Sequence, residues 1–294
     1  MSLKDTKTKW VLFLATSEVN PDDRHVYDLS FGVFCLESSG VSPEDIHVYI
    51  DGADRDEIHR YLSVGTNNNY EIKNTDIFFE ENNEEYENLV MFITGHGNID
   101  GIDAVEPIRP YKLLNYLKTQ TSLNNAIVYL GQCDAGVFNY VNAFKKDDEP
   151  NIVLIGATNL HASISSSTTE SLLDGKDGFS WTANLFLLHV FKWFSEPKDV
   201  DGDGKFTIMD SYKYAGVLSN ILNKHNKVLS FPNTMSHHAE FIQFQKEYNE
   251  SPTPQNLVKL KATSELYYKQ LDLTYTHQEC WILNSVPAQY IDFQ

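Results

Sequence analysis

The sequence predicts an α/β fold with a mostly parallel central sheet flanked by helices. Three observations support this prediction: five short runs are almost continuously apolar, helical patterns lie between them, and the loops are polar and long. Strands covered by helices on both faces have this continuous hydrophobicity. The predicted strands are Trp10 to Ala15, Ile46 to Ile50, Leu89 to Thr94, Ala126 to Leu130 and Ile152 to Ala157.

Three segments between or after these strands have the apolar spacing of helices. Apolar residues recur every three or four positions between Val26 and Cys35, and this pattern stops near Gly40. A second helix is predicted from Tyr111 to Leu117, directly after a proline. The segment from Asp177 to Phe194 carries large apolar residues at helical spacing, which predicts a long buried helix.

The acidic composition of the chain disfavours some classes of binding partner. The chain has 294 residues, 41% of them apolar, and 23 basic against 41 acidic residues give a net charge of −18. Such a charge repels nucleic acids and anionic membranes. We therefore expect a protein or peptide substrate and neither a nucleic acid nor a membrane as partner, and the oligomeric state stays open.

The cysteine count and the apolar runs indicate the compartment. Three cysteines are too few, and odd in number, for a disulfide framework. The run Val11 to Ala15 is too short for a signal peptide, and no run has the length of a membrane span. A cytoplasmic protein is the expectation.

One composition change divides the chain. The segment Gln245 to Gln255, with two prolines, has the character of a linker. We therefore predict a domain at 1–245 and a C-terminal extension at 246–294, the latter with a helix and a terminal strand from Cys280 to Leu283.

A histidine and a cysteine each follow a predicted strand within a turn of small residues. His96 lies between Gly95 and Gly97, and Cys133 precedes Asp134-Ala135-Gly136. Reactive groups collect at the carboxyl ends of parallel strands, and a nearby imidazole activates a thiol. We predict His96 and Cys133 as a catalytic pair, with the N–H groups of Gly97 and Cys133 as oxyanion donors. An inert thiol beside a loop histidine is the alternative.

Four segments together resemble the legumain-like cysteine peptidases of the caspase and gingipain clan. The resemblance covers roughly residues 10–245 and implies a caspase-like three-layer sandwich with a thiol protease activity, so that the chain would be a cysteine-type endopeptidase. The segments are Val11 to His25, Gly40 to Ile50, Cys133-Asp134-Ala135-Gly136 and Ile155-Gly156-Ala157-Thr158-Asn159.

The resemblance also implies roles for single residues. Cys133 corresponds to the nucleophile, His96 to the proton donor, and Asp22 falls near a position that orients the histidine. Gly95 replaces an aspartate implicated in peptide ligation, which implies cleavage without ligation. Opposite charges among the implied pocket residues leave the substrate preference open; these residues are Arg24, His25, Asp134, Ser163 and Asp174.

A second constellation follows the pattern of an EF-hand calcium loop. The twelve residues from Asp199 to Asp210 place a glycine, Gly204, at the sharp turn. Position twelve is aspartate rather than the usual glutamate. We predict a bound Ca²⁺ that joins two helices, although a regulatory role is an alternative. The predicted ligands are Asp199, Asp201, Asp203 and Asp210 with the carbonyl of Lys205.

Two functions remain open from the sequence. The first is a cysteine endopeptidase that forms an acyl-enzyme on Cys133 and releases it with water. The alternative is a non-catalytic or latent interaction protein of the caspase fold, whose C-terminal extension covers the cleft.

Overall fold

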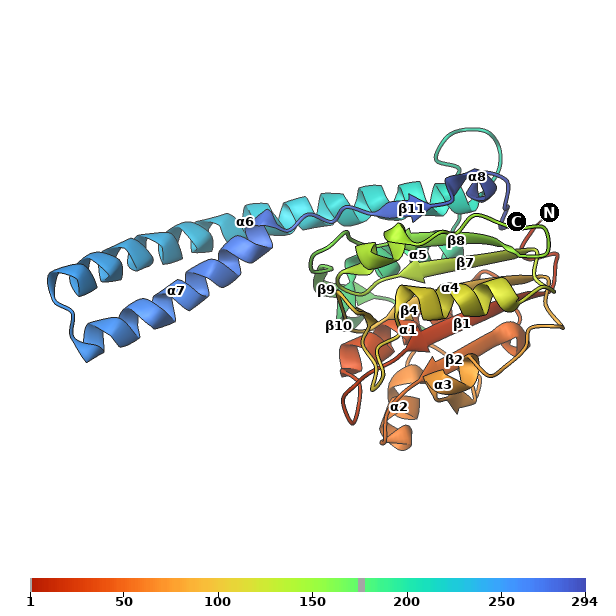
Figure 1. The fold of residues 1–294 in the computed structure, drawn as a ribbon, viewed down its shortest axis with the longest axis horizontal. Coiled ribbons are helices and arrows are strands. Elements are labelled where there is room, and N and C mark those ends of the chain that lie inside the picture. The colour runs from red at the N-terminus through yellow and green to blue at the C-terminus, as the bar shows by residue number, and fades with distance from the viewer. Residues whose placement is uncertain (1, 174–177) are drawn as a thin grey trace. The chain divides into compact units, whose positions relative to one another are not determined.

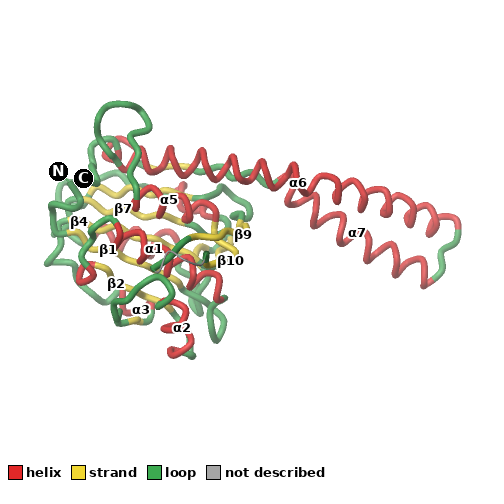
Figure 2. The backbone as a smooth tube through the Cα atoms, turned by 180° about the vertical axis from the view of Figure 1, so that it is seen from behind, coloured by secondary structure: helices red, strands yellow, loops and turns green. Residues whose placement is uncertain are grey.

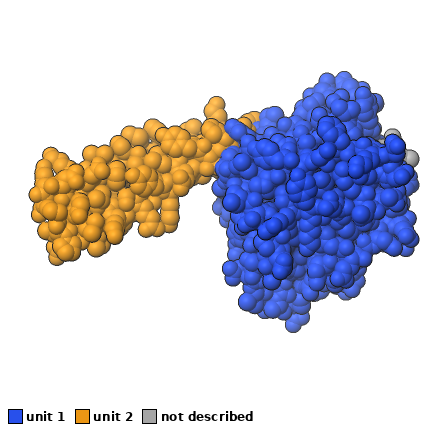
Figure 3. Space-filling model, viewed as in Figure 1, with its two compact units in different colours: residues 1–219, 278–294 blue, residues 220–277 orange. Residues whose placement is uncertain are grey.

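The computed structural model describes residues 2–173 and 178–294. The chain divides into two compact units, shown in separate colours in Figure 3. Unit 1 comprises Met1–Ser219 with Gln278–Gln294, and unit 2 comprises Asn220–His277. The predicted boundary between residues 245 and 246 does not coincide with this division, because those residues lie inside one continuous helix of 43 residues.

Unit 1 is built on a seven-stranded sheet with the order β11-β8-β7-β4-β1-β2-β3 (Figure 1). Neighbouring strands are parallel except for β11, which runs antiparallel to β8. All five predicted strands are present, and the predicted mostly parallel α/β sheet is confirmed. The strands are β1 (Thr8–Leu14), β2 (Ile46–Ile50), β3 (Ile72–Lys73), β4 (Asn88–Thr94), β7 (Asn125–Leu130), β8 (Asn151–Gly156) and β11 (Trp281–Leu283).

Helices cover both faces of the sheet, which gives three layers (Figure 2). In β1, Trp10 and Leu12 pack in one apolar cluster, while Val11 and Phe13 pack in the other. This alternation follows from the two-residue period of a strand. The first cluster includes residues of α1 (Asp23–Ser38), α5 (Leu185–Ser195) and the start of α6 (Ile208–Glu250), and the second includes residues of α3 (Thr75–Phe78) and α4 (Pro110–Thr119).

Two of the three predicted helices are confirmed with slightly wider bounds. Helix α1 contains the predicted segment 26–35 and ends before Gly40, whose φ of 91° suits a glycine. Helix α4 contains the predicted segment 111–117, and its first residue is Pro110, where a missing N–H has no cost.

The third predicted helix is wrong in its first part. Residues Phe179–Asn184 form a strand, β10, which pairs antiparallel with β9 (Ser165–Glu170). Buried Trp181 and Ala183 alternate with exposed neighbours, and this two-residue period is that of a strand. Helix α5 begins only at Leu185, where the side chain of Asn184 caps it. Asp177 lies outside the described residues.

The remaining short elements of unit 1 lie between the main strands and helices. They are α2 (Arg55–Leu62), the strand pair β5 (Gly97–Asn98) and β6 (Gly101–Ile102), the terminal helix α8 (Ser285–Ala288), and two 3₁₀ helices at Pro43–Asp45 and Ala135–Tyr140.

The C-terminal region differs in two ways from the prediction. The predicted linker is helical as far as Glu250, and a second long helix, α7 (Pro254–Tyr275), begins after only three residues. The part of α6 from residue 220 onward and the whole of α7 belong to unit 2, whereas the first residues of α6 belong to unit 1. Residues 278–294 belong to unit 1 instead, because β11 pairs with β8 and Phe293 is fully buried. Among the described helices, none is long and apolar enough to cross a membrane.

Candidate active site

The strand order places His96 and Cys133 at one edge of the sheet. His96 follows β4 and Cys133 follows β7, and these strands are parallel neighbours in which Ile93 pairs with Leu130. The Gly131 N–H extends the ladder by donating to the Ile93 carbonyl at 2.8 Å. The two candidate residues therefore leave the sheet side by side.

The two loops after these strands pack closely against each other. A Cβ atom on Gly97 would lie 2.5 Å from the Cys133 carbonyl oxygen and would also overlap the Gln132 side chain. Only glycine permits this approach. The half-buried Cys133 thiol accepts a hydrogen bond from the Ser163 N–H at 3.3 Å. No hydrogen bond between described residues joins this thiol to His96.

Asp134 redirects the chain directly after the cysteine. Its φ of 52° lies in the left-handed region, which is unfavourable for a residue with a Cβ. Its N–H donates to the His161 carbonyl at 2.9 Å, and its carbonyl accepts from Val137 at 3.0 Å. These bonds hold the turn into the 3₁₀ helix.

Asp22 is the partner of His96. The His96 Nε2 atom lies 3.2 Å from the Asp22 Oδ2 atom, and both side chains are about half exposed. Arg24 also approaches this carboxylate, with its Nε atom at 3.4 Å. Partial burial acts to raise the pKa of Asp22, but the hydrogen bond and charge of His96, and then those of Arg24, outweigh it and lower that pKa.

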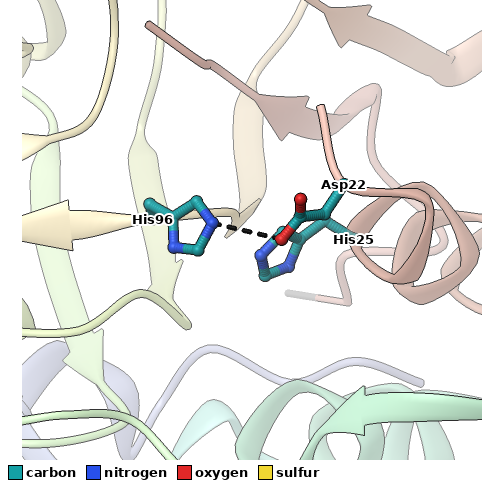
Figure 4. Close-up of side chains that lie close together, drawn as sticks. All are labelled: Asp22, His25 and His96. Carbon is teal, nitrogen blue, oxygen red and sulfur yellow. Dashed lines mark hydrogen bonds and ion pairs between the residues drawn. The ribbon is translucent and has the colours of Figure 1, made fainter. Parts of the chain in front are cut away.

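His25, predicted to line a substrate pocket, is buried instead, and its ring lies beside Asp22 on the side toward which His96 points (Figure 4). It is only 3% exposed, and the two imidazole rings meet edge to face with centroids 5.1 Å apart. The His25 Nδ1 atom lies 3.2 Å from the Thr94 hydroxyl, which donates to Asp28 at 3.1 Å. His25 thus packs against the His96 ring and does not line an open pocket.

Asp28 is a structural residue that was not predicted from the sequence. It is a buried carboxylate in α1, 3% exposed, and its Oδ1 atom accepts hydrogen bonds from the Trp181 indole at 2.9 Å and the Asn184 N–H at 3.2 Å. Together with the Thr94 hydroxyl, these donors satisfy it. The available signal was its spacing three residues after His25, on the same helix face.

The other predicted pocket residues gather near the loop before β9. Arg24 reaches from α1 to the Ser165 hydroxyl at 3.1 Å. The Ser163 hydroxyl accepts a hydrogen bond from the Asn184 side chain at 3.2 Å, while its N–H holds the thiol. Asp174 lies outside the described residues. Two of the predicted pocket residues thus contact this segment or belong to it: Arg24 bonds to Ser165, and Ser163 bonds to the Cys133 thiol.

An open cleft of about 650 Å³ lies beside the imidazole of His96. Polar and acidic side chains dominate its lining. The lining residues are Ser17, Glu18, Val19, Asn20, Asp22, His96 and Asp103.

The two remaining thiols are those of Cys35 and Cys280. Burial raises the pKa of Cys35 strongly, and burial raises that of Cys280 to about 12. Both thiols therefore stay protonated near neutral pH. Cys133 differs from both in its position at the edge of the sheet.

Three of the predicted calcium ligands converge in the loop before α6. Oxygen atoms of Asp199, Asp201 and Asp203 lie within 4.8 Å of one another. Asp199 accepts hydrogen bonds from the N–H groups of Gly202 and Gly204, at 2.6 and 2.8 Å, which fold the loop around it. These backbone donors, that of Gly204 foremost, lower the pKa of Asp199.

Asp210, the fourth predicted carboxylate, has a different task. It is fully buried, and its Oδ2 atom accepts from the N–H and hydroxyl of Thr207 at 2.9 and 2.7 Å. The Asp210 N–H donates back to the Thr207 hydroxyl at 3.3 Å, so the pair forms a capping box at the start of α6. Lys205 contributes its N–H to Asp203 at 2.9 Å.

Comparison with known proteins gives a similarity of fold and no sequence relative. No family model matches the sequence, and no curated protein matches it either. The fold is similar to that of caspase-1 from Spodoptera frugiperda, with a TM-score of 0.40 and 10% sequence identity. The match covers 72% of this chain and 76% of that chain.

Proposed function

We propose that this chain is a cysteine endopeptidase with Cys133 as nucleophile and His96 as its acid and base. The observation that supports it most is the placement of both residues after the neighbouring parallel strands β4 and β7, with Gly97 packed on the Cys133 carbonyl. The legumain-like assignment is part of the proposal and depends on the sequence resemblance alone.

The hydrogen bonds suggest a division of roles within the site. With the His96 Nε2–H donating to Asp22, the Nδ1 atom is left to take the thiol proton and pass it to the leaving amine. Thiolate attack on a peptide carbonyl forms the acyl-enzyme, and water then releases the acid. His96 is about half exposed, so its ring has room to turn toward a bound substrate.

The substrate pocket is proposed between α1 and the segment before β9. Arg24 lies at the centre of this region, since its guanidinium contacts both Asp22 and Ser165. An acidic or amide side chain would pair with Arg24, whereas a basic one would pair with Asp134. A peptide library with each side chain before the scissile bond distinguishes the two.

The test of the proposed activity is the reaction of Cys133 with a thiol-directed peptide warhead. Cys133→Ala is expected to abolish labelling and to lower peptide cleavage by at least about 1,000-fold, because loss of a nucleophile removes the covalent route. Cys280→Ala is the matched control and is expected to keep both. Labelling that persists in Cys133→Ala would exclude this site as the reaction centre.

We also propose that the loop from Asp199 to Asp210 binds Ca²⁺ as a structural ion. Three converging carboxylates repel one another, and a hard divalent cation relieves that repulsion. The prediction is a higher melting temperature in millimolar Ca²⁺ than in a chelator, and no such difference in Asp199→Asn combined with Asp203→Asn. An unchanged melting temperature in the wild-type chain would oppose calcium binding.

A further inference from the structure

A cluster of two histidines and one carboxylate surrounds His96. One ligand atom from each of Asp22, His25 and His96 lies within 4.8 Å of the others, and the side chains converge (Figure 4). Asp22 directly precedes α1, His25 lies in its first turn, and His96 comes from the loop after β4. Two elements far apart in the sequence thus supply the cluster.

His25 carries a buried nitrogen atom that forms no hydrogen bond with any described residue. The Thr94 hydroxyl donates its hydrogen to Asp28, so it accepts from the His25 Nδ1–H. This order leaves the lone pair on Nε2. The Nε2 atom is buried and has no partner within residues 2–173 and 178–294. A buried lone pair without a donor is unfavourable unless a ligand such as a metal ion meets it.

The surroundings of His25 are those of a metal ligand. Its Nδ1 atom lies 3.7 Å from the Asp28 Oδ2 atom and shares the Thr94 hydroxyl with it. A carboxylate or hydroxyl behind the imidazole fixes its orientation and raises its basicity toward a metal. His25 is therefore a fixed anchor with its free nitrogen already oriented.

We propose that Asp22, His25 and His96 bind one Zn²⁺ ion. Two imidazole nitrogens and one carboxylate oxygen are a zinc ligand set, whereas Ca²⁺ and Mg²⁺ prefer oxygen alone. Three protein ligands leave a fourth position for water. Ligands of a tetrahedral zinc lie about 3.3 Å apart, and the half-exposed side chains of Asp22 and His96 can move to close that distance.

Zinc binding would change the contacts of two neighbours. Arg24 contacts the Asp22 Oδ2 atom at 3.4 Å and would release it to the cation. His96 would lose its freedom to carry a proton, so bound Zn²⁺ inhibits the peptidase. This inhibition rests on the proposed function, but the binding itself does not.

Zinc affinity of the full chain tests the proposal without any substrate. Competition with a chromophoric chelator is expected to give one Zn²⁺ per chain, and Co²⁺ is expected to give the visible absorption of a four-coordinate site. Asp22→Asn and His25→Gln remove a ligand. Loss of a residue that only hydrogen-bonds to a metal ligand weakens binding about 10- to 100-fold. Each of these variants loses a ligand itself and should therefore weaken Zn²⁺ binding by more than that.

Thr94→Val tests the orientation of His25 separately. It retains all three ligands but removes the hydroxyl behind Nδ1, and it is expected to weaken Zn²⁺ binding about 10- to 100-fold. Since Thr94 and His25 are buried, a melting curve of each variant verifies folding. The exposed Asp22→Asn decides the question if either buried variant unfolds.

Two control variants exclude other zinc sites. His59→Gln changes an exposed histidine of α2, and the pair His237→Gln with His238→Gln changes two adjacent histidines of α6; both should bind as the wild type does. Unchanged affinity in Asp22→Asn, or loss of affinity in the α6 variant or in Cys133→Ala, would overturn the proposal. Zinc binding without peptidase activity would instead count against the proposed function alone.

Discussion

Toward the amino end of the sheet, buried Lys9 donates hydrogen bonds to Glu81 and Asn83. Beyond the carboxyl end, both polar atoms of buried Gln132 have no partner among the residues that the structure describes. Both side chains are at most 2% exposed. The amino-end group is charged and bonded to a carboxylate and an amide, whereas the carboxyl-end group is neutral and has no partner among the described residues. These two buried side chains thus differ in whether their polar atoms are satisfied.

Glu81 is the centre of the paired network. Its carboxylate accepts from Lys9 at 2.9 Å, from Lys73 at 2.8 Å and from the Tyr49 hydroxyl at 2.5 Å. Partial burial acts to raise the pKa of Glu81, but the hydrogen bonds from Lys73, Tyr49 and Lys9 outweigh it and lower the pKa to about 2. This end of the sheet contributes to stability.

The carboxyl end has the opposite character. Gln132, the His25 Nε2 atom and the left-handed Asp134 are all unfavourable for folding, and they lie around Cys133. Unsatisfied and strained groups persist where a ligand or a reaction uses them. The difference between the two ends indicates that stability and function are separated along the strands.

The largest expected effect on stability is at the amino end. Glu81→Gln leaves the Lys9 ammonium buried without its counter-charge and should lower the free energy of unfolding by about 3 kcal/mol, measured by urea denaturation. The control Arg60→Gln breaks a pair with side chains 68% and 40% exposed and should change it by at most about 0.5 kcal/mol. Equal effects in the two variants would contradict the contrast.

The pH dependence of stability examines the same network. The folded chain lowers the pKa of Glu81 from 4.5 to about 2, so the unfolded chain binds the proton first as the pH falls. The stabilisation is complete above the unfolded value and is lost between it and the folded value. The difference in unfolding free energy between wild type and Glu81→Gln should therefore shrink over that interval; a constant difference would show that the carboxylate charge is not its source.

A smaller effect with the opposite sign is expected at the carboxyl end. Gln132→Met keeps the length of the side chain but removes its two buried polar atoms, which have no partner among the described residues. It should raise the free energy of unfolding by about 1–2 kcal/mol. Asn184→Leu is the matched control, because that buried amide donates to the Gly131 carbonyl and caps α5. It should lower the same quantity by about 1–3 kcal/mol. Destabilisation by Gln132→Met would indicate that this side chain is satisfied after all.

The smallest expected effect concerns the backbone at Asp134. Asp134→Gly removes the Cβ that disfavours its φ of 52°, and the gain should be about 0.5 kcal/mol after the greater chain entropy of glycine is included. Asn284→Gly, at a φ of 63°, loses a side-chain hydrogen bond to the Ile152 carbonyl and should not gain. Thermal unfolding distinguishes the two; a loss in Asp134→Gly would mean that its side chain is needed for folding.

The strands were predictable because their signal is local. Each core strand is a continuous apolar run of five to seven residues. Runs of this length favour a buried strand, because buried helices are usually longer. The helix prediction for Phe179–Asn184 was wrong because Trp181 lies four residues before Leu185 and so continues the helical spacing of the segment that follows. Only the pairing of this segment with β9, a polar strand with no apolar signal, decides between helix and strand.

The polar contacts of the candidate site were predictable only in part. Asp22 and His96 are 74 positions apart, and Asp28 reaches donors 153 and 156 positions away. No spacing rule connects residues so distant. Asp210 shows the same limit at short range, because the loop pattern predicts a cation ligand and the folded chain uses the carboxylate as a helix cap.

The sequence by itself determined the order and type of the main strands, and with them the edge at which His96 and Cys133 stand, because apolar periodicity and chain direction are local properties. The tertiary structure alone decided which side chains are buried there and which meet. It packed His25 against His96 with a buried Nε2 atom that has no partner among the described residues. It also made residues 278–294 part of unit 1. Those outcomes depend on packing between distant segments, which no local pattern encodes.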